Sequence, residues 1–149
     1  MWIALLAAAS LLALDRLLKH LARQGKLTLS AANGHVVMTH HENSGMIFGL
    51  CKKQTVLSRH LPCVSLLAVL RYFLPHFSRR SILSKAGIVL LTLGGISNLY
   101  DRIRRGSVTD YLCFPKLPVK KLARLIWNMA DFMILLGALF TWVGTWKDK

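Results

Sequence analysis

The stretch Gly95–Asp110, GISNLYDRIRRGSVTD, directly follows one of the most apolar runs of the chain, AGIVLLTLG. The chain has 20 Lys and Arg but only 6 Asp and Glu, and this stretch places Asp101 and Asp110 where an apolar helix ends. A third carboxylate, Asp131, lies within another apolar run, WNMADFMILL. Carboxylates in or beside apolar spans are costly and usually mark function. These three residues are therefore the first candidates for a site.

The composition around this stretch is that of a membrane protein. Apolar residues make up 54% of the 149 residues, and the mean hydropathy is +0.44. A helix needs about 20 mostly apolar residues to cross a bilayer. Four stretches meet this requirement, at about residues 2–21, 55–74, 82–99 and 125–146. We expect an all-α membrane protein in which four transmembrane helices form a single domain, residues 1–149.

The connection at about residues 24–53 has a different pattern. KLTLS and VVMTHHEN alternate polar and apolar residues on either side of Asn33-Gly34. An Asn-Gly pair between alternating runs predicts a β-hairpin. We therefore expect a small extramembrane β-element between the first and second helices. The later stretch SVTDYLCF is short and apolar, and we expect it to re-enter or skim the membrane surface.

The net charge of +14 suggests an anionic binding partner, and the sequence favours lipid over nucleic acid as that partner. The cations lie mostly between apolar runs, and no basic helix with interleaved aromatic residues occurs. Basic segments beside membrane spans attract anionic headgroups, so we expect anionic membrane lipids as partners and no nucleic acid. Cys51, Cys63 and Cys113 have no metal-ligand spacing, and His40-His41-Glu42 is no metal motif. No metal and no cofactor is expected.

Two Asn–Asp pairs share one spacing. Asn98 precedes Asp101 by three residues, and Asn128 precedes Asp131 by three, so each pair would share a helix face. If the last helix begins at Leu125, Asp131 lies roughly 9 Å inside it at 1.5 Å per residue.

Another pair stands in the first helix. Asp15 and Lys19 are four residues apart and one turn along the same face. The pair is either a local ion pair where the helix leaves the bilayer or a brace beside a site.

Asp110 and Asp131 can form a catalytic pair if the SVTD stretch folds back toward the last helix. Two adjacent carboxylates cannot both ionise cheaply, so one keeps a proton. The ionised one can then take a proton from water while the protonated one polarises a carbonyl. The spacing alone equally allows structural polar pairs or an ion-translocation path. Other hydrolytic chemistries fit less well, since the chain has no GxSxG and a single Glu.

Four motifs occur in an order that resembles the lipoprotein signal peptidase family, also called prolipoprotein signal peptidase or signal peptidase II. They are LDRLLKH, ENSGMIFGL, GGISNLYDRIRRGSVTDYL and WNMADFMILLGAL, and they span Asp15 to Leu139. The resemblance implies a four-helix intramembrane aspartyl protease. Such an enzyme removes signal peptides from diacylglyceryl-modified prolipoproteins, cutting just before the modified cysteine.

The resemblance also implies residue roles. Asp110 and Asp131 would be the catalytic pair, and Asp101 would organise the site with its neighbours Asn98 and Arg102. The full set of residues implied to bind substrate or organise the site is Asn43, Gly45, Asn98, Asp101, Arg102, Asn128, Asp15 and Lys19. The chain departs from the family where Met46-Ile47 replace small residues and where Trp127 replaces Phe, which puts the substrate range in question.

The resemblance implies a monomer in the bacterial cytoplasmic membrane, with several spans and the site near the outer face. The Lys and Arg count contradicts this orientation, because the two long connections are the more basic ones and the positive-inside rule places them in the cytoplasm. We follow the resemblance, since an exported, lipidated substrate is met outside, and expect Cys51 and Cys113 on that side. Two alternatives stay open. One is an inactive relative that binds acylated peptides, and the other is a small proton or cation transporter that uses Asp101 and Asp131.

Overall fold

The computed structural model describes residues 2–45 and 55–147. Met46, Ile47 and Cys51, which the sequence singled out, lie outside the described residues. The helices are α1 (Trp2–Arg23), α2 (Thr55–Phe73), α3 (Ile82–Arg105), α4 (Lys120–Ala123) and α5 (Met129–Lys147), with 3-10 turns η1 (Ala32–Gly34) and η3 (Leu74–Arg79). The strands are β1 (Leu29–Ala31), β2 (Val36–Asn43), β3 (Val108–Cys113) and β4 (Ile126–Trp127).

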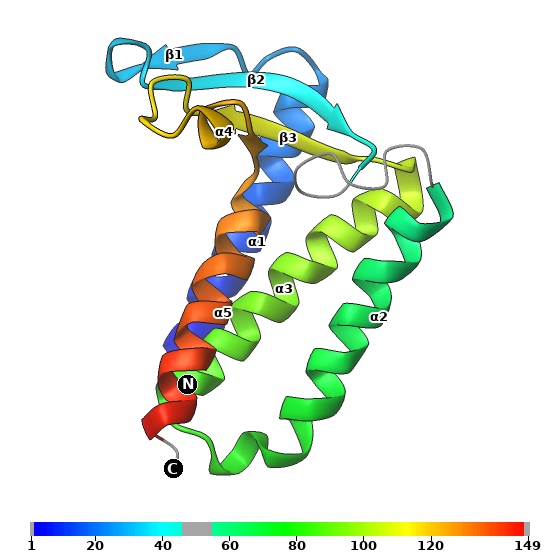
Figure 1. Ribbon diagram of the computed structural model, residues 1–149, viewed down its shortest axis with the longest axis vertical. Helices are drawn as coiled ribbons and strands as arrows, with labels where there is room; N and C mark the ends of the chain where they lie inside the picture. Colours follow the sequence, from blue (N-terminus) through cyan, green and yellow to red (C-terminus); the bar gives the residue numbers. More distant parts are fainter. Residues whose placement is uncertain (1, 46–54, 148–149) are drawn as a thin grey trace.

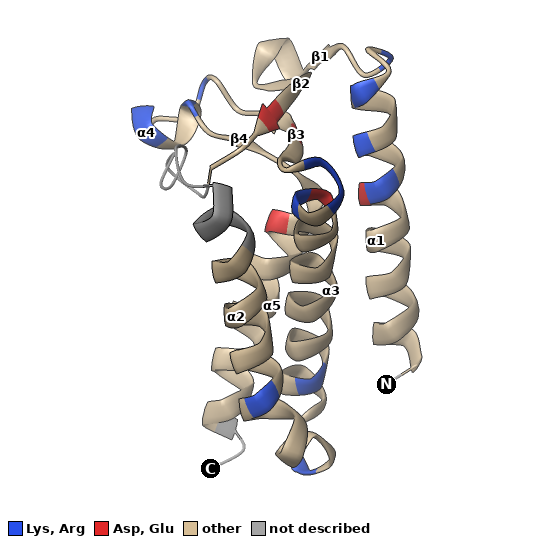
Figure 2. Cartoon of the chain, turned by 90° about the vertical axis from the view of Figure 1, so that its right-hand side faces the viewer, with Lys and Arg blue, Asp and Glu red and all other residues tan. Residues whose placement is uncertain are grey.

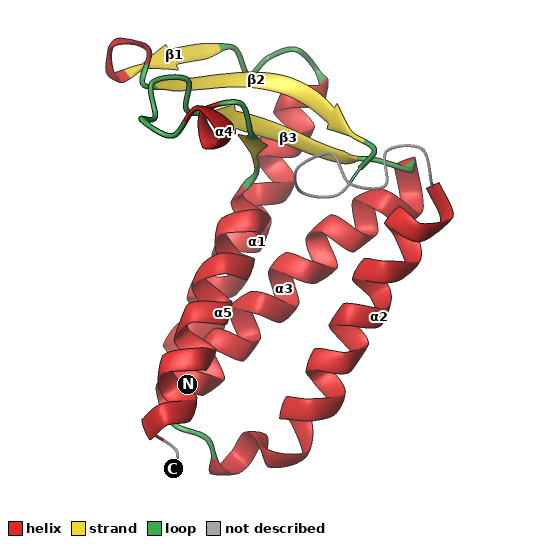
Figure 3. Ribbon diagram, viewed as in Figure 1, coloured by secondary structure: helices red, strands yellow, loops and turns green. Residues whose placement is uncertain are grey.

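The four long helices run side by side, and the sheet covers one end of them (Figure 1). Both termini lie at the opposite end, and α2 stands at the side of α3 (Figure 3). Within the described residues, three segments are long and apolar enough to cross a membrane: His60–Arg79, Ile82–Arg105 and Met129–Trp146. The first helix is not among them, because Asp15, Arg16 and Lys19 interrupt its apolar run. The fold is therefore mostly helical, with three candidate membrane helices.

The tightest helix contact joins α3 to α5 through glycines. A Cβ on Gly87 would lie 2.5 Å from the backbone N of Thr141, and a Cβ on Gly137 would lie 2.5 Å from that of Leu91. Small residues let helices approach closely where lipid supplies no hydrophobic driving force. This contact fixes the position of α5 beside α3, and both helices carry polar residues into the site.

The hairpin predicted at Asn33-Gly34 is confirmed. Strands β1 and β2 pair antiparallel, with Ala31 opposite Val36, and the turn between them has positive φ at Asn33 (53°) and Gly34 (81°). Asn and Gly are the residues that adopt this conformation most readily. The hairpin is one half of a four-stranded sheet with the order β1-β2-β3-β4.

The stretch SVTDYLCF, which we expected to re-enter or skim the membrane surface, is part of the sheet. These residues form β3, which pairs antiparallel with β2, His41 opposite Asp110, and with β4, Leu112 opposite Trp127. The sheet is thus larger than the expected element and draws on two connections. Val, Thr and Tyr favour strands, and β3 is buried on both faces, as expected for a central strand, although it includes the polar residues Thr109 and Asp110.

Two helix ends also differ from the expected ones. Helix α3 continues past residue 99 to Arg105 and ends at Gly106, whose φ of 80° suits glycine at a helix end. Helix α5 begins at Met129 rather than at Leu125, because residues 126–127 form β4. Asp131 therefore lies in the first turn of α5, at the sheet end of the helix, and not 9 Å inside it.

Candidate active site

Asp110 lies in the middle of β3, and asparagine amides hold both of its carboxylate oxygens. Asn128 Nδ2 donates to Oδ1 at 2.6 Å, and Asn43 Nδ2 donates to Oδ2 at 2.9 Å. The Asn43 amide is itself oriented, because its Oδ1 accepts from the backbone N–H of Gly45 at 3.1 Å. Asp110 is buried, with 2% of its surface exposed. Both Asn residues thus present N–H groups to Asp110 and cannot turn without losing another bond.

Asp131 and Asn128 form a reciprocal cap at the start of α5. The Asp131 backbone N–H donates to Asn128 Oδ1 at 3.0 Å, and the Asn128 backbone N–H donates to Asp131 Oδ2 at 3.0 Å. This is the geometry of a capping box, here built from Asn and Asp. The other oxygen, Oδ1, accepts from Asn98 Nδ2 at 2.8 Å. Asn128 therefore contacts both Asp110 and Asp131 and brings the β3 and α5 carboxylates together.

Burial raises the pKa of the Asp110 carboxyl from its ordinary value of 3.8 to about 7, and the nearby Asp131 charge raises it further in the same direction. The amide hydrogen bonds from Asn43 and Asn128 oppose this rise. Within the described residues, neither Asp110 nor Asp131 has an ion pair with a Lys, Arg or His. Asp110 can therefore gain or lose a proton near neutral pH.

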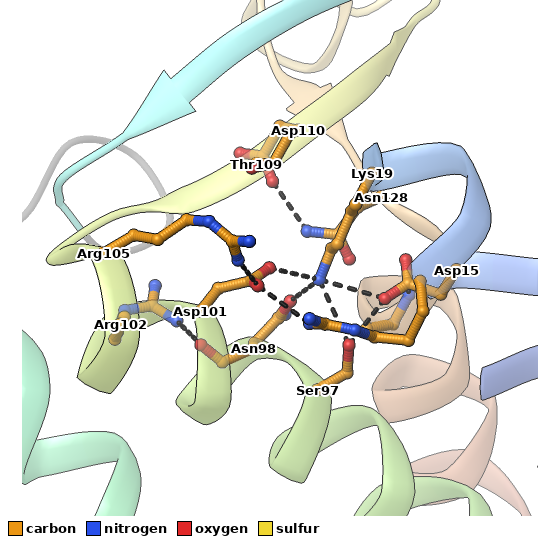
Figure 4. A network of polar contacts seen from close by, with 12 residues as sticks. Asp15, Lys19, Ser97, Asn98, Asp101, Arg102, Arg105, Thr109, Asp110 and Asn128 are labelled. Carbon is orange, nitrogen blue, oxygen red and sulfur yellow. Dashed lines mark hydrogen bonds and ion pairs between the residues drawn. The ribbon is translucent and has the colours of Figure 1, made fainter. Parts of the chain in front are cut away.

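A second group of carboxylates lies beside this pair and is held by cations (Figure 4). Lys19 Nζ lies 3.0 Å from Asp15 Oδ2 and 3.0 Å from Asp101 Oδ2, and all three side chains are fully buried. Asp101 Oδ1 also pairs with Arg16 at 2.8 Å and Arg105 at 3.0 Å. These two carboxylates are neutralised inside the protein by three cations.

Asn98 links the two groups. Its Oδ1 accepts from Lys19 Nζ at 2.9 Å, which turns its NH₂ toward Asp131. The Asp15–Lys19 pair is thus a buried part of this network and not an isolated pair at a helix end. The chain of contacts runs from α1 through α3 to the first turn of α5.

The expectation that Asp101 organises the site with Asn98 and Arg102 stays a prediction. In the described part of the chain, the bonded partners of Asp101 are Arg16, Lys19 and Arg105 rather than Arg102. Consecutive helix residues do not face each other, which explains the difference. The Arg102 guanidinium instead donates to the Gly45 carbonyl at 3.2 Å and to the Asn98 carbonyl at 3.5 Å. Arg102 thereby ties the Asn43–Gly45 turn to α3.

The sequence analysis missed Tyr111 and Ser97. The Tyr111 hydroxyl donates to Asp15 Oδ1 at 3.1 Å and accepts from the Met129 backbone N–H at 3.0 Å. Ser97 Oγ donates to Asp15 Oδ2 at 2.6 Å. Tyr111 is fully buried next to Asp110 in sequence and joins β3, α1 and the start of α5. Assigning residues 108–113 to a strand would have indicated a buried side chain at this position.

A family model described as Signal peptidase (SPase) II matches residues 7–147. The chain belongs to the signal peptidase II family. The lipoprotein signal peptidase of Clostridioides difficile strain 630 is 32% identical over 119 residues, which cover 76% of this chain and 72% of that relative. The lipoprotein signal peptidase of Moorella thermoacetica is 32% identical over 141 residues, which cover 91% of this chain and 87% of that relative.

Two solved structures share the fold of this signal peptidase II family member. Each is a bacterial membrane enzyme determined by the in meso method, one at 2.3 Å and one at 1.9 Å resolution. The first has a TM-score of 0.80 and 19% identity and covers 99% of this chain and 90% of its own. The second has a TM-score of 0.78 and 19% identity, and the match covers 100% of this chain and 96% of the chain in that structure. Family membership identifies a protease, and together with the apolar helices it indicates a bacterial membrane protein.

Proposed function

We propose that this chain is an intramembrane aspartyl endopeptidase that removes signal peptides from diacylglyceryl-modified prolipoproteins. Asp110 and Asp131 are the catalytic pair. The proposal rests on the contacts of these two carboxylates. Three asparagine amides donate to them, and within the described residues no cation forms an ion pair with either. The pKa of Asp110 is raised to about 7.

In the proposed reaction, one carboxyl of the pair is protonated and the other is ionised. The ionised carboxylate takes a proton from water while the water oxygen attacks the scissile carbonyl carbon. The protonated carboxyl donates to the carbonyl oxygen and stabilises the tetrahedral intermediate. The C–N bond then breaks, and the nitrogen leaves with a proton from the pair. The asparagine amides keep both carboxyl groups in place throughout.

The Asn43–Gly45 turn is the proposed substrate contact beside Asp110. Asn43 bonds Asp110 directly, and the Gly45 carbonyl is fixed by Arg102. The Gly45 backbone is buried at the point where the described part of this connection ends. A peptide bound along this turn would pass the catalytic pair.

The proposed membrane arrangement has four spans, with α1 as the fourth. Its residues Asp15 and Lys19 are fully buried and form an ion pair with each other inside the protein. Its first half exposes Trp2, Ile3 and Leu6 to the surroundings. Asp131 lies in the first turn of α5, so the pair would sit near one membrane surface, where acyl chains hold a lipidated substrate. We place this end outside the cytoplasmic membrane and expect a monomer without cofactor.

The transporter alternative loses support from the contacts of Asp101. A proton or cation relay needs a carboxylate that can change partners, and Asp101 is held by Lys19, Arg16 and Arg105. An inactive relative that binds acylated peptides is separated from the enzyme only by a cleavage assay.

The test is mass spectrometry of the products after the purified chain meets a prolipoprotein with and without its diacylglyceryl group. We expect a signal peptide cut just before the modified cysteine, from the lipidated form alone. Binding without cleavage would favour the inactive relative, and equal turnover of both forms would indicate a general peptidase. Labelling of Cys113 in intact cells by a membrane-impermeant thiol reagent checks the orientation, and labelling only after lysis would contradict it.

A further inference from the structure

The segment of residues 116–125, KLPVKKLARL, lies outside the network described above. It joins β3 to β4, contains α4, and holds four cations and no acid. Figure 2 shows α4, coloured for Lys, at the edge of the molecule at the sheet end. The four cations of this segment are exposed, whereas Asp110 is buried.

The contacts of these cations differ from those of the cations in the site. Lys116 Nζ donates to the Asn33 carbonyl at 2.5 Å and ties the segment to the hairpin turn. Lys120, Lys121 and Arg124 are exposed, and none of them forms an ion pair with any described residue. Three positive charges at one place thus lack a counter-charge within the described part of the protein.

Apolar side chains alternate with these cations and are also exposed. Leu117 is 40% exposed, Val119 is 52% exposed and Leu122 is 36% exposed. Three exposed apolar side chains so close together are unfavourable in water. Apolar residues beside Lys and Arg are typical of segments that lie in the membrane interface, with the apolar groups at the acyl boundary and the cations at the phosphates.

The segment is attached to the sheet at both of its ends. At its base, Cys113 pairs with Ile126 between β3 and β4, and the turn is closed by bonds from the N–H groups of Leu122 (2.9 Å) and Ala123 (3.0 Å) to the Val119 carbonyl. The same strand β3 carries Asp110 three residues before Cys113. If a membrane surface binds this segment, it therefore also sets the distance of Asp110 from that membrane.

We propose that residues 116–125 form an interfacial anchor that binds the anionic phosphate headgroups of the surrounding bilayer. The exposed apolar side chains enter the acyl boundary, and Lys120, Lys121 and Arg124 contact the headgroups. The anchor holds the sheet, and with it Asp110, at a defined distance from the membrane. It also explains why a connection on the proposed outer side is so basic, since these cations would serve lipid binding there.

The experiment places an environment-sensitive fluorophore on Val119→Cys, in a background where Cys51, Cys63 and Cys113 are replaced by Ala. The protein is measured in nanodiscs of phosphatidylcholine with and without phosphatidylglycerol. We expect a blue shift and quenching by headgroup-proximal spin labels only when phosphatidylglycerol is present, with loss of both at high salt. The same fluorophore on Leu29→Cys, at the opposite edge of the sheet, is expected to stay in water.

Two variants with equal loss of charge separate a local anchor from general attraction. Lys120→Gln/Lys121→Gln is expected to shift the phosphatidylglycerol concentration needed for the blue shift at least several-fold upward. Lys26→Gln/Arg104→Gln removes two exposed cations elsewhere in the sheet half and is expected to leave it unchanged. An equal effect of both variants, insertion in pure phosphatidylcholine, or no insertion at all would overturn the proposal.

A measurement on the unaltered chain protects the test against misfolding of the cysteine variants. Hydrogen exchange of peptides covering residues 116–125 is expected to slow when phosphatidylglycerol is added to the nanodiscs. Unchanged exchange would contradict the anchor. Neither readout uses cleavage, so failure of the anchor and failure of the proposed protease activity are distinguishable.

Discussion

The two carboxylate groups at the sheet end are both buried but have opposite partners. Asp15 and Asp101 lie against Lys19, and Asp101 also pairs with Arg16 and Arg105. The other group, Asp110 and Asp131, is bonded by neutral amides of Asn residues. A cation within ion-pair distance favours the ionised form, whereas an amide bond favours it less and burial opposes it. The two groups thus differ in their partners: cations surround Asp15 and Asp101, whereas Asp110 is bonded by neutral amides and has a raised pKa.

The comparison gives each group a separate role in the proposed enzyme. The cation-held group fixes α1 against α3 and, through Lys19 and Asn98, orients an amide toward Asp131. In the proposed function, the amide-held group carries the chemistry. Replacing a carboxylate of the amide-held group should therefore lower the rate of cleavage. Replacing a cation that holds the other group should lower the stability of the fold. The expected effects below are ordered from the largest to the smallest.

The largest effect is expected for Asp110→Asn and Asp131→Asn. Each keeps the size of the side chain but cannot accept the proton of the attacking water, so turnover of a lipidated prolipoprotein should fall about 10³-fold or more. Both proteins should still melt cooperatively in detergent. Substantial activity in either purified variant would exclude that residue from the catalytic pair.

The next effect is on stability and concerns Lys19. Lys19→Met leaves Asp15 and Asp101 buried with fewer counter-charges, which should lower the free energy of unfolding by about 3–5 kcal/mol. Lys85→Met is the control, because the Lys85 ammonium contacts only an exposed carbonyl, that of Ser78, among the described residues. Thermal melting of both variants measures the difference. Equal melting temperatures would mean that the buried ion pairs do not hold α1 in place.

The pKa of Asp110 predicts a pH dependence with a definite sign. The folded value of about 7 lies above the ordinary value of 3.8, so the folded protein binds this proton more tightly than the unfolded chain. Its contribution to stability is present below about pH 4 and is lost as the pH rises to about 7, by roughly 4 kcal/mol at about 1.4 kcal/mol per pKa unit. Melting of wild type relative to Asp110→Asn should fall over this range. Parallel melting profiles from pH 4 to 8 would contradict the raised value.

The smallest effect is expected for Arg16→Gln. The Arg16 side chain is 32% exposed, and Asp101 keeps Lys19 and Arg105 when Arg16 is neutralised. Partly exposed ion pairs contribute about 0–1 kcal/mol, so melting and turnover should change little. A loss as large as that of Lys19→Met would show that the three cations of Asp101 act as one unit.

Sequence patterns predicted the elements whose residues are close in the chain. The Asn33-Gly34 hairpin, the extent of α2 and the i,i+4 pair of Asp15 and Lys19 all depend on local spacing, and the structure contains each of them. The resemblance to signal peptidase II rested on short sequence motifs that can be read without a structure, and the family is confirmed. The roles of the individual site residues stay predictions.

The errors arose where one spacing fits two structures. Asn128 and Asp131 are three residues apart, which suits both a helix face and a capping box, and the structure has the capping box. The stretch SVTDYLCF is short and mostly apolar, which suits both a buried central strand and a segment at the membrane surface, and the structure has the strand β3. The Arg16–Asp101 pair joins residues 85 positions apart, and no local pattern indicates it.

Infrared spectroscopy of the protonated carboxyl band tests the difference between the two carboxylate groups most directly. In wild-type protein in detergent, we expect a carboxyl C=O band that is present at pH 5 and disappears as the pH rises through about 7. The band should be absent in Asp110→Asn and unchanged in Arg16→Gln, whose substitution touches only the cation-held group. A band that persists in Asp110→Asn, or no band titrating near pH 7, would contradict the assignment of the titrating proton to Asp110.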